Sequence, residues 1–142
     1  MFFFSLDAGS WLAVLGARMS YHLPYFQARI SVALDEGWFK YDCIRARGTE
    51  FHGRYRPVSP VRLRDPGTLE HWLTERYCLY TEVRGSVYRA EIHHEQWPLQ
   101  DAEAEIPVNT IAAAAGVELP QIQPLLHFSK RLDVLVWPLK RA

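Results

Sequence analysis

Residues 27–46 read QARISVALDEGWFKYDCIRA, and this stretch decides the fold class. Two runs rich in Val, Ile, Phe, Tyr and Trp, at 27–34 and 38–46, flank the turn signal Asp35-Glu36-Gly37. β-Branched and aromatic residues favour strands, and a short turn with glycine between two such runs is typical of a β-hairpin. The segment therefore predicts two antiparallel strands.

Similar patterns continue along the chain. A second hairpin signal, Arg84-Gly85, separates strand-like runs at 77–83 and 86–93. Further strand patterns cover residues 2–6, 50–55, 97–106 and 132–139. Six to eight strands at hairpin spacing predict a mainly β fold, built as a mostly antiparallel sheet or barrel.

Two or three short helices are expected between these strands, each after a capping residue. They cover 11–19 after Asp7 or Ser10, 69–77 after Thr68, and 110–115 after Asn109. In the first, Trp11, Val14, Leu15 and Arg18 share one face. Pro24 stops that helix, and segment 57–67, which carries three prolines and a glycine, is expected to be a loop.

Composition limits the possible partners. The chain has 142 residues, 49% of them hydrophobic and 13% aromatic, which fits one β-rich domain with its own core. Its formal net charge is zero and its basic residues are scattered among acids, so neither nucleic acid nor an anionic membrane is an expected partner. The N-terminal MFFFSL lacks a basic region, and no apolar run is long enough for a membrane span. We therefore expect a soluble cytoplasmic protein.

The two cysteines, Cys43 and Cys78, both fall in strand patterns and form no CxxC pair. Reduced, packed thiols are the favoured interpretation, with a disulfide or a nucleophile as alternatives. The dinucleotide motif GxGxxG, the P-loop and the GxSxG elbow are all missing, and no cofactor is expected.

Five segments, in this order, resemble the DUF2071 family of uncharacterised bacterial proteins, also called the YqjF-like family. They are FFSLDA (3–8), ARMSYHLPYFQA (17–28), LTERYCLY (73–80), IHHEQWPLQDA (92–102) and HFSKRLDVLVWPL (127–139). The resemblance spans nearly all of a single domain, 1–142. It implies the acetoacetate decarboxylase-like fold, a closed and largely antiparallel β-barrel with an internal pocket.

The resemblance also implies that family members carry a further segment before FFSLDA. The chain is then expected to be incomplete at its N-terminus, or to be a short form. An unpaired sheet edge invites pairing with another copy, so a homodimer is expected for the short form.

Segment 17–28 also resembles the Gly-Tyr-Pro-Lys segment of acetoacetate decarboxylases, whose lysine forms a Schiff base with the substrate. Here Pro24 is followed by Tyr25 and Phe26, and neither can form an imine. Lys130 beside Arg131 is the remaining lysine in a family-like motif, and a solvated lysine is the favoured interpretation there.

Glu75 is the candidate catalytic group, as a carboxylate whose pKa an apolar pocket would raise. Adjacent strand residues point to opposite faces, so at most one of Glu75 and Arg76 points into a barrel. Arg18 is a candidate carboxylate clamp, through its bidentate guanidinium. For both candidates the alternative is a structural role, as a salt bridge or as a tie between helix and loop.

The other candidate ligand contacts are Tyr21 and Tyr25, which flank Pro24, and one of His93 and His94. Core packing with a satisfied hydroxyl, or a structural histidine, is the alternative. Adjacent histidines on a strand face opposite ways and no zinc-ligand spacing is present, so no metal site is predicted.

These residues predict a small-molecule binding barrel that takes a carboxylate or carbonyl compound without Schiff-base chemistry. One alternative is a lyase or hydratase that acts on a keto or carboxylic acid, with Glu75 as proton carrier. Another is a truncated remnant without function.

Overall fold

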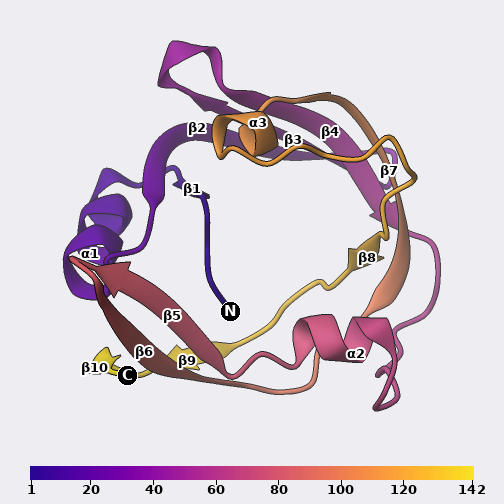
Figure 1. The fold of residues 1–142 in the computed structure, drawn as a ribbon. Coiled ribbons are helices and arrows are strands. Elements are labelled where there is room, and N and C mark those ends of the chain that lie inside the picture. The colour runs from indigo at the N-terminus through magenta and orange to yellow at the C-terminus, as the bar shows by residue number, and fades with distance from the viewer.

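Two β-sheets and three short α-helices form the fold in the computed structural model, which describes residues 1–142. The larger sheet has the order β1-β2-β3-β4-β7-β8, and the smaller has the order β10-β6-β5, with β9 also paired to β6. The six-stranded sheet curls as a half-barrel, and the elements follow a ring in the view of Figure 1, with the N-terminus inside it. The mainly β prediction is confirmed.

The strands of the larger sheet are β1 (Leu6–Ala8), β2 (Tyr25–Asp35), β3 (Trp38–Arg45), β4 (Glu50–Pro57), β7 (Gln100–Asn109) and β8 (His127–Phe128). Those of the smaller are β5 (Cys78–Val83), β6 (Ser86–His94), β9 (Val134–Val136) and β10 (Lys140–Arg141). The helices are α1 (Trp11–Tyr21), α2 (Leu69–Thr74) and α3 (Ile111–Ala114), with a 3₁₀ turn at Ala46–Gly48.

Both predicted hairpins are confirmed, and their turns explain why. Asp35 pairs with Trp38 and Val83 pairs with Ser86, so each hairpin closes over two residues. Those central residues have positive φ, 47° and 83° at Glu36-Gly37 and 51° and 78° at Arg84-Gly85. Positive φ at both positions defines the type I′ turn, whose twist matches that of the flanking strands.

The predicted strands at the two ends of the chain were partly wrong. The first strand is Leu6–Ala8 rather than 2–6, and Phe2 forms a single parallel bridge to Tyr80. The last predicted strand, 132–139, is reduced to the three residues of β9, with β10 following at Lys140–Arg141. The limits of strands this short depend on the strand that they pair with. The local sequence pattern carries no information about that pairing.

Two of the three predicted helix caps are confirmed. The hydroxyl oxygens of Ser10 and Thr68 accept hydrogen bonds from the third amide that follows each, at 3.4 Å and 3.3 Å. The third helix starts from Thr110 and not from Asn109. On α1 the predicted face is largely exposed, since Val14 is its one buried residue and Trp11 is 63% exposed.

The larger sheet has one apolar and one charged face, as strand alternation requires. On β3 the apolar face carries Phe39, Tyr41 and Cys43, and cross-strand partners on β2 and β4 continue it with Leu34, Val32, Ile30, Tyr55 and Phe51. The aromatic rings stack, with Phe39 5.6 Å from Tyr55 and 5.5 Å from Phe128 between ring centroids. Burial on this face raises the pKa of Tyr41 to about 12.

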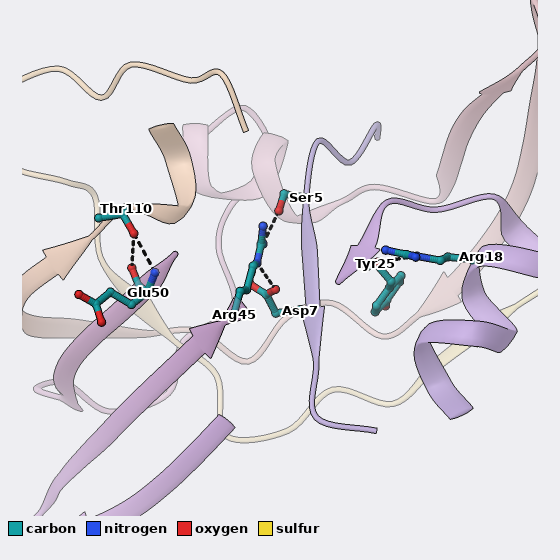
Figure 2. A network of polar contacts seen from close by, with 7 residues as sticks. All are labelled: Ser5, Asp7, Arg18, Tyr25, Arg45, Glu50 and Thr110. Atoms are coloured by element: carbon teal, nitrogen blue, oxygen red, sulfur yellow. Dashed lines mark hydrogen bonds and ion pairs between the residues drawn. The ribbon is translucent and has the colours of Figure 1, made fainter. Parts of the chain in front are cut away.

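A nearly buried ion pair joins the N-terminal segment, residues 1–8, to this sheet. Arg45 donates from Nε and Nη2 to the two carboxylate oxygens of Asp7, at 2.5 Å and 2.8 Å, and from Nη2 to Ser5 Oγ at 2.5 Å (Figure 2). The side chains of Arg45 and Asp7 are 8% and 11% exposed. The Arg45 guanidinium also lies 4.3 Å from the ring centroid of Phe26. Each charge is compensated, which a buried ion requires.

We expect Arg45→Met to destabilise the protein by about 3–5 kcal/mol, because the substitution leaves the Asp7 carboxylate buried without a partner. Urea unfolding followed by circular dichroism measures this loss. The double variant Arg45→Met/Asp7→Leu should recover most of it, since no buried charge then remains unpaired. Arg131→Met, which breaks the exposed pair with Asp133, is the control and should change stability by less than about 1 kcal/mol. Equal losses of unfolding free energy in Arg45→Met and Arg131→Met would contradict this prediction.

The charged face carries an ion-pair cluster across β3 and β4. Nδ1 of His52 lies 2.6 Å from an Asp42 carboxylate oxygen, and its Nε2 lies 3.3 Å from Glu50. The hydrogen bond to Asp42, and then that to Glu50, raises the pKa of His52. The hydrogen bonds from His52 and from Ser31 lower the pKa of Asp42.

This cluster should make stability depend on pH. The raised pKa of His52 adds stability that is complete below its unfolded value of about 6.5 and is lost as pH rises through the folded value. The lowered pKa of Asp42 adds stability above its unfolded value of about 3.9 that is lost as pH falls through the folded value. The difference in unfolding free energy between wild type and His52→Gln should therefore be largest between about pH 4 and 6.5. His93→Gln, at an exposed position on β6 that forms no ion pair, is the control. A His52→Gln difference that does not change from pH 4 to 9 would exclude the linkage.

Candidate functional site

A cavity of about 510 Å³ lies where the N-terminal segment, α1, the end of α2, and strands β5, β6 and β9 meet. Its lining is mostly apolar: Met1, Phe3, Leu6, Ala17, Leu23, Leu73, Leu79, Ile92, Leu132, Val134 and Val136. The polar or amphipathic side chains that line it are Ser20, Tyr21, Tyr25, Thr74, Arg76, His94 and Trp97. An apolar hollow with a few polar groups is the usual form of a small-molecule site.

The segment that links α1 to β2 forms one wall of this cavity. His22 ends α1 in the left-handed conformation, with φ of 50°, and Thr81 on β5 donates its hydroxyl hydrogen to the His22 carbonyl at 3.0 Å. This places Leu23 in a small core with Leu79, Ala90 and Ile92 of the smaller sheet. Tyr21 and Tyr25, on either side of that core residue, pack against it and reach the cavity.

Arg76 is the cation of the cavity. It lies between α2 and β5, and its guanidinium stacks 3.7 Å from the ring centroid of Trp72. None of the ion pairs in the structure involves Arg76. A guanidinium held by an aromatic ring at the wall of an apolar cavity, without an acidic partner, is suited to bind an anion.

His94 presents one defined nitrogen to the surroundings of the cavity. Its Nδ1 lies 2.8 Å from the Glu95 backbone carbonyl, which can only accept a hydrogen bond, so Nδ1 carries the proton and Nε2 is the basic nitrogen of the neutral ring. The ring stacks 4.8 Å from that of Tyr77 and meets Trp97 edge-on at 6.2 Å. His94 is buried and His93 is exposed, so the prediction that the two face opposite ways is confirmed.

Glu75 is not in a strand, as the argument from strand alternation assumed, but caps the C-terminus of α2. Its Oε2 accepts a hydrogen bond from the Tyr77 hydroxyl, and this bond to a carboxylate raises the pKa of Tyr77. Its Oε1 is buried without a hydrogen-bond partner, as is Nε1 of Trp97. Glu75 does not line the cavity, whereas its neighbour Arg76 does.

The structure therefore brings three of the predicted site residues, Tyr21, Tyr25 and His94, to one cavity. Arg18 lies outside the lining: its Nε donates to the Tyr25 carbonyl at 2.7 Å (Figure 2), and its guanidinium is 5.7 Å from the Phe26 ring centroid. Arg76 and Trp97 were not among the predicted contacts. The one signal in the sequence for Arg76 is its place beside Glu75 in LTERY.

Both cysteines are free, and burial, followed by the nearby Asp7 carboxylate, raises the pKa of Cys43. No group of three or more His, Cys, Asp or Glu side chains is arranged to hold a metal ion. None of the helices has the length and apolar character needed to cross a membrane.

Comparison of the sequence with known proteins shows the family of this chain. The model of the DUF2071 family, described as an uncharacterized conserved protein, matches residues 1–133, and the chain belongs to this family. It is 48% identical over 143 residues to the uncharacterized protein YqjF of Bacillus subtilis (strain 168). That match covers 99% of this chain and 59% of YqjF, so the chain spans well under two thirds of the relative's length. No solved structure matches the chain.

Proposed function

We propose that this DUF2071-family chain binds a small carboxylate or carbonyl compound in the cavity beside Arg76. The observation that carries the proposal is the unpaired Arg76 guanidinium, which is the one Arg, Lys, Asp or Glu side chain among mostly apolar lining residues. Tyr21 and Tyr25 supply hydroxyl donors, and the apolar lining would accommodate the rest of the ligand.

Binding in this proposal is non-covalent. None of the three lysines lines the cavity: Lys40 pairs with Asp35 on the charged face of the larger sheet, and Lys130 and Lys140 are exposed. A Schiff base with the ligand would need a lysine within reach of its carbonyl carbon. In this proposal, the resemblance to acetoacetate decarboxylases therefore extends to the fold and to the kind of ligand. It does not extend to imine chemistry.

Arg76→Ala should weaken binding of hexanoate by about 10- to 100-fold, because a charge-assisted hydrogen bond contributes about 1.5–3 kcal/mol. Isothermal titration calorimetry measures the affinity, with hexanamide, which lacks the negative charge, as the matched ligand. Hexanamide should lose less affinity than hexanoate, because its carbonyl oxygen accepts a hydrogen bond but carries no full negative charge.

Arg18→Ala separates this site from the one predicted from the sequence. If Arg76 is the anion contact, Arg18→Ala should leave hexanoate affinity within about threefold of wild type, and Arg131→Ala at an exposed position should not change it. A loss in Arg18→Ala with none in Arg76→Ala would overturn the assignment of Arg76 and favour Arg18.

An acid–base enzyme, a lyase or hydratase for keto or carboxylic acids, is the second candidate. Two observations favour it: Glu75 has a buried carboxylate oxygen without a partner, and its other oxygen is bonded to Tyr77, on which His94 stacks. A carboxylate with one oxygen shielded from solvent and the other hydrogen-bonded to a tyrosine hydroxyl is suited to proton transfer. Glu75 does not itself line the cavity, so it would act through the Tyr77 hydroxyl, which donates a hydrogen bond to it.

Under the enzyme hypothesis, Glu75→Gln should reduce turnover of 3-oxo acids by about 100-fold or more, while hexanoate affinity stays unchanged. Proton-exchange NMR at the carbon next to the carbonyl detects the reaction in D₂O. Glu70→Gln, on the preceding helix, is the control for the loss of one negative charge. If the wild-type protein binds these acids without exchanging their protons, the enzyme hypothesis is excluded and the binding function is retained.

A further inference from the structure

We propose that two copies of this chain associate through the free edge of β2, in antiparallel register with Val32 on the two-fold axis. The proposal concerns a surface remote from the cavity residues and stands independently of the binding function proposed above. It rests on an unpaired strand edge, on the direction of its backbone groups and on its charges.

The free edge is long for an uncovered strand. β2 has eleven residues, and β3 pairs with it from Ala28 to Asp35 on one side. On the other side β1 pairs with Tyr25, Phe26 and Gln27 alone. From Ala28 onward no segment of the chain pairs with that side. Exposed edges of this kind are templates for pairing with another strand.

The backbone groups along this edge alternate in a defined way. The two-residue turn makes Asp35 and Trp38 the hydrogen-bonded pair that closes the hairpin, so the N–H and C=O of Asp35, Ala33, Ser31 and Arg29 point toward β3. Those of Leu34, Val32 and Ile30 therefore point to the free edge. Their side chains lie on the apolar face of the sheet, where Val32 is 58% exposed and Leu34 is 66% exposed.

The sequence of this edge is complementary to itself. When two copies of 29–35, RISVALD, run antiparallel with Val32 opposite Val32, Ile30 faces Leu34 on the apolar face. On the charged face Arg29 faces Asp35, and by symmetry the pair occurs twice. A Val32 pair on the axis is also a hydrogen-bonded pair, as the backbone directions above require. Registers shifted by two residues keep the backbone pattern but lose both charge pairs.

The charges are available for this contact. The side chain of Arg29 takes part in none of the ion pairs of the structure and is exposed. Asp35 uses Oδ2 for its pair with Lys40, on the β3 side, and leaves Oδ1 without a partner. Opposite charges across strands stabilise pairing, and like charges destabilise it. Because the contact is made by the same patch on both copies, it closes at two and does not propagate.

A charge exchange tests both the partner and the register. Analytical ultracentrifugation should give wild type twice the chain mass of 16.5 kDa, and Arg29→Asp and Asp35→Arg should each weaken the dimer about tenfold or more. Mixing the two variants should restore dimers, because each introduced residue then faces an opposite charge. The double variant Arg29→Asp/Asp35→Arg should also dimerise.

Val32→Pro supplies a second test that does not depend on charge. Proline removes the amide that points to the free edge, which spares the β2–β3 ladder, and proline is tolerated on edge strands. Val32→Pro should be monomeric with an unchanged circular dichroism spectrum, while the matched Val32→Thr, which keeps the amide, should dimerise. A wild type that is monomeric at its highest soluble concentration would overturn the proposal. So would a dimer that persists in all three variants, Arg29→Asp, Asp35→Arg and Val32→Pro.

Discussion

The ion pair of Arg45 with Asp7 is the constraint on which the arrangement of the two sheets depends. The N-terminal segment contacts both sheets: Leu6–Ala8 pairs with β2, and Phe2 bridges to Tyr80 on β5, whose amide donates to the Met1 carbonyl at 2.8 Å. Arg45 holds the middle of this segment through Ser5 and Asp7. A buried charge without a partner is unstable. If the N-terminal segment left β3, Arg45 or Asp7 would therefore become exposed to solvent or remain buried without its partner.

The shape of the cavity depends on the ion pair of Arg45 with Asp7. Phe3 and Leu6 belong to the anchored segment and line the cavity, and α1 begins directly after β1, with Ala17 and Tyr21 on the cavity wall. At the end of α1, the Arg18 guanidinium holds the Tyr25 carbonyl where β2 begins. Arg18 thus contributes to the position of Tyr25 even though its own charge does not face the cavity. The candidate site is assembled by the sheet interface and not by one loop.

Much of the fold was predictable because its signals are local. The turns at Glu36-Gly37 and Arg84-Gly85 need positive φ, and the caps at Ser10 and Thr68 act on amides three residues away. The limits of β1, β9 and β10 could not be predicted, because each is set by pairing with a strand that is distant in the sequence. At the site, strand alternation separated His93 from His94, but it failed for Glu75 and Arg76, where α2 ends at Thr74. The helical phase of α1 likewise could not say that Arg18 lies outside the cavity lining.

The small number of buried residues has a thermodynamic consequence. Eleven of the 142 residues are buried, and large apolar side chains such as Phe4, Met19 and Leu34 are more than half exposed in the folded chain. The heat capacity of unfolding rises with newly exposed apolar surface, by about 0.45 cal/K/mol per Å². A single copy already exposes much apolar surface when it is folded. Its heat capacity of unfolding is therefore below the usual value of about 12–15 cal/mol/K per residue. Its curve of free energy against temperature is accordingly flat, and any contact that covers the apolar face would make that curve steeper.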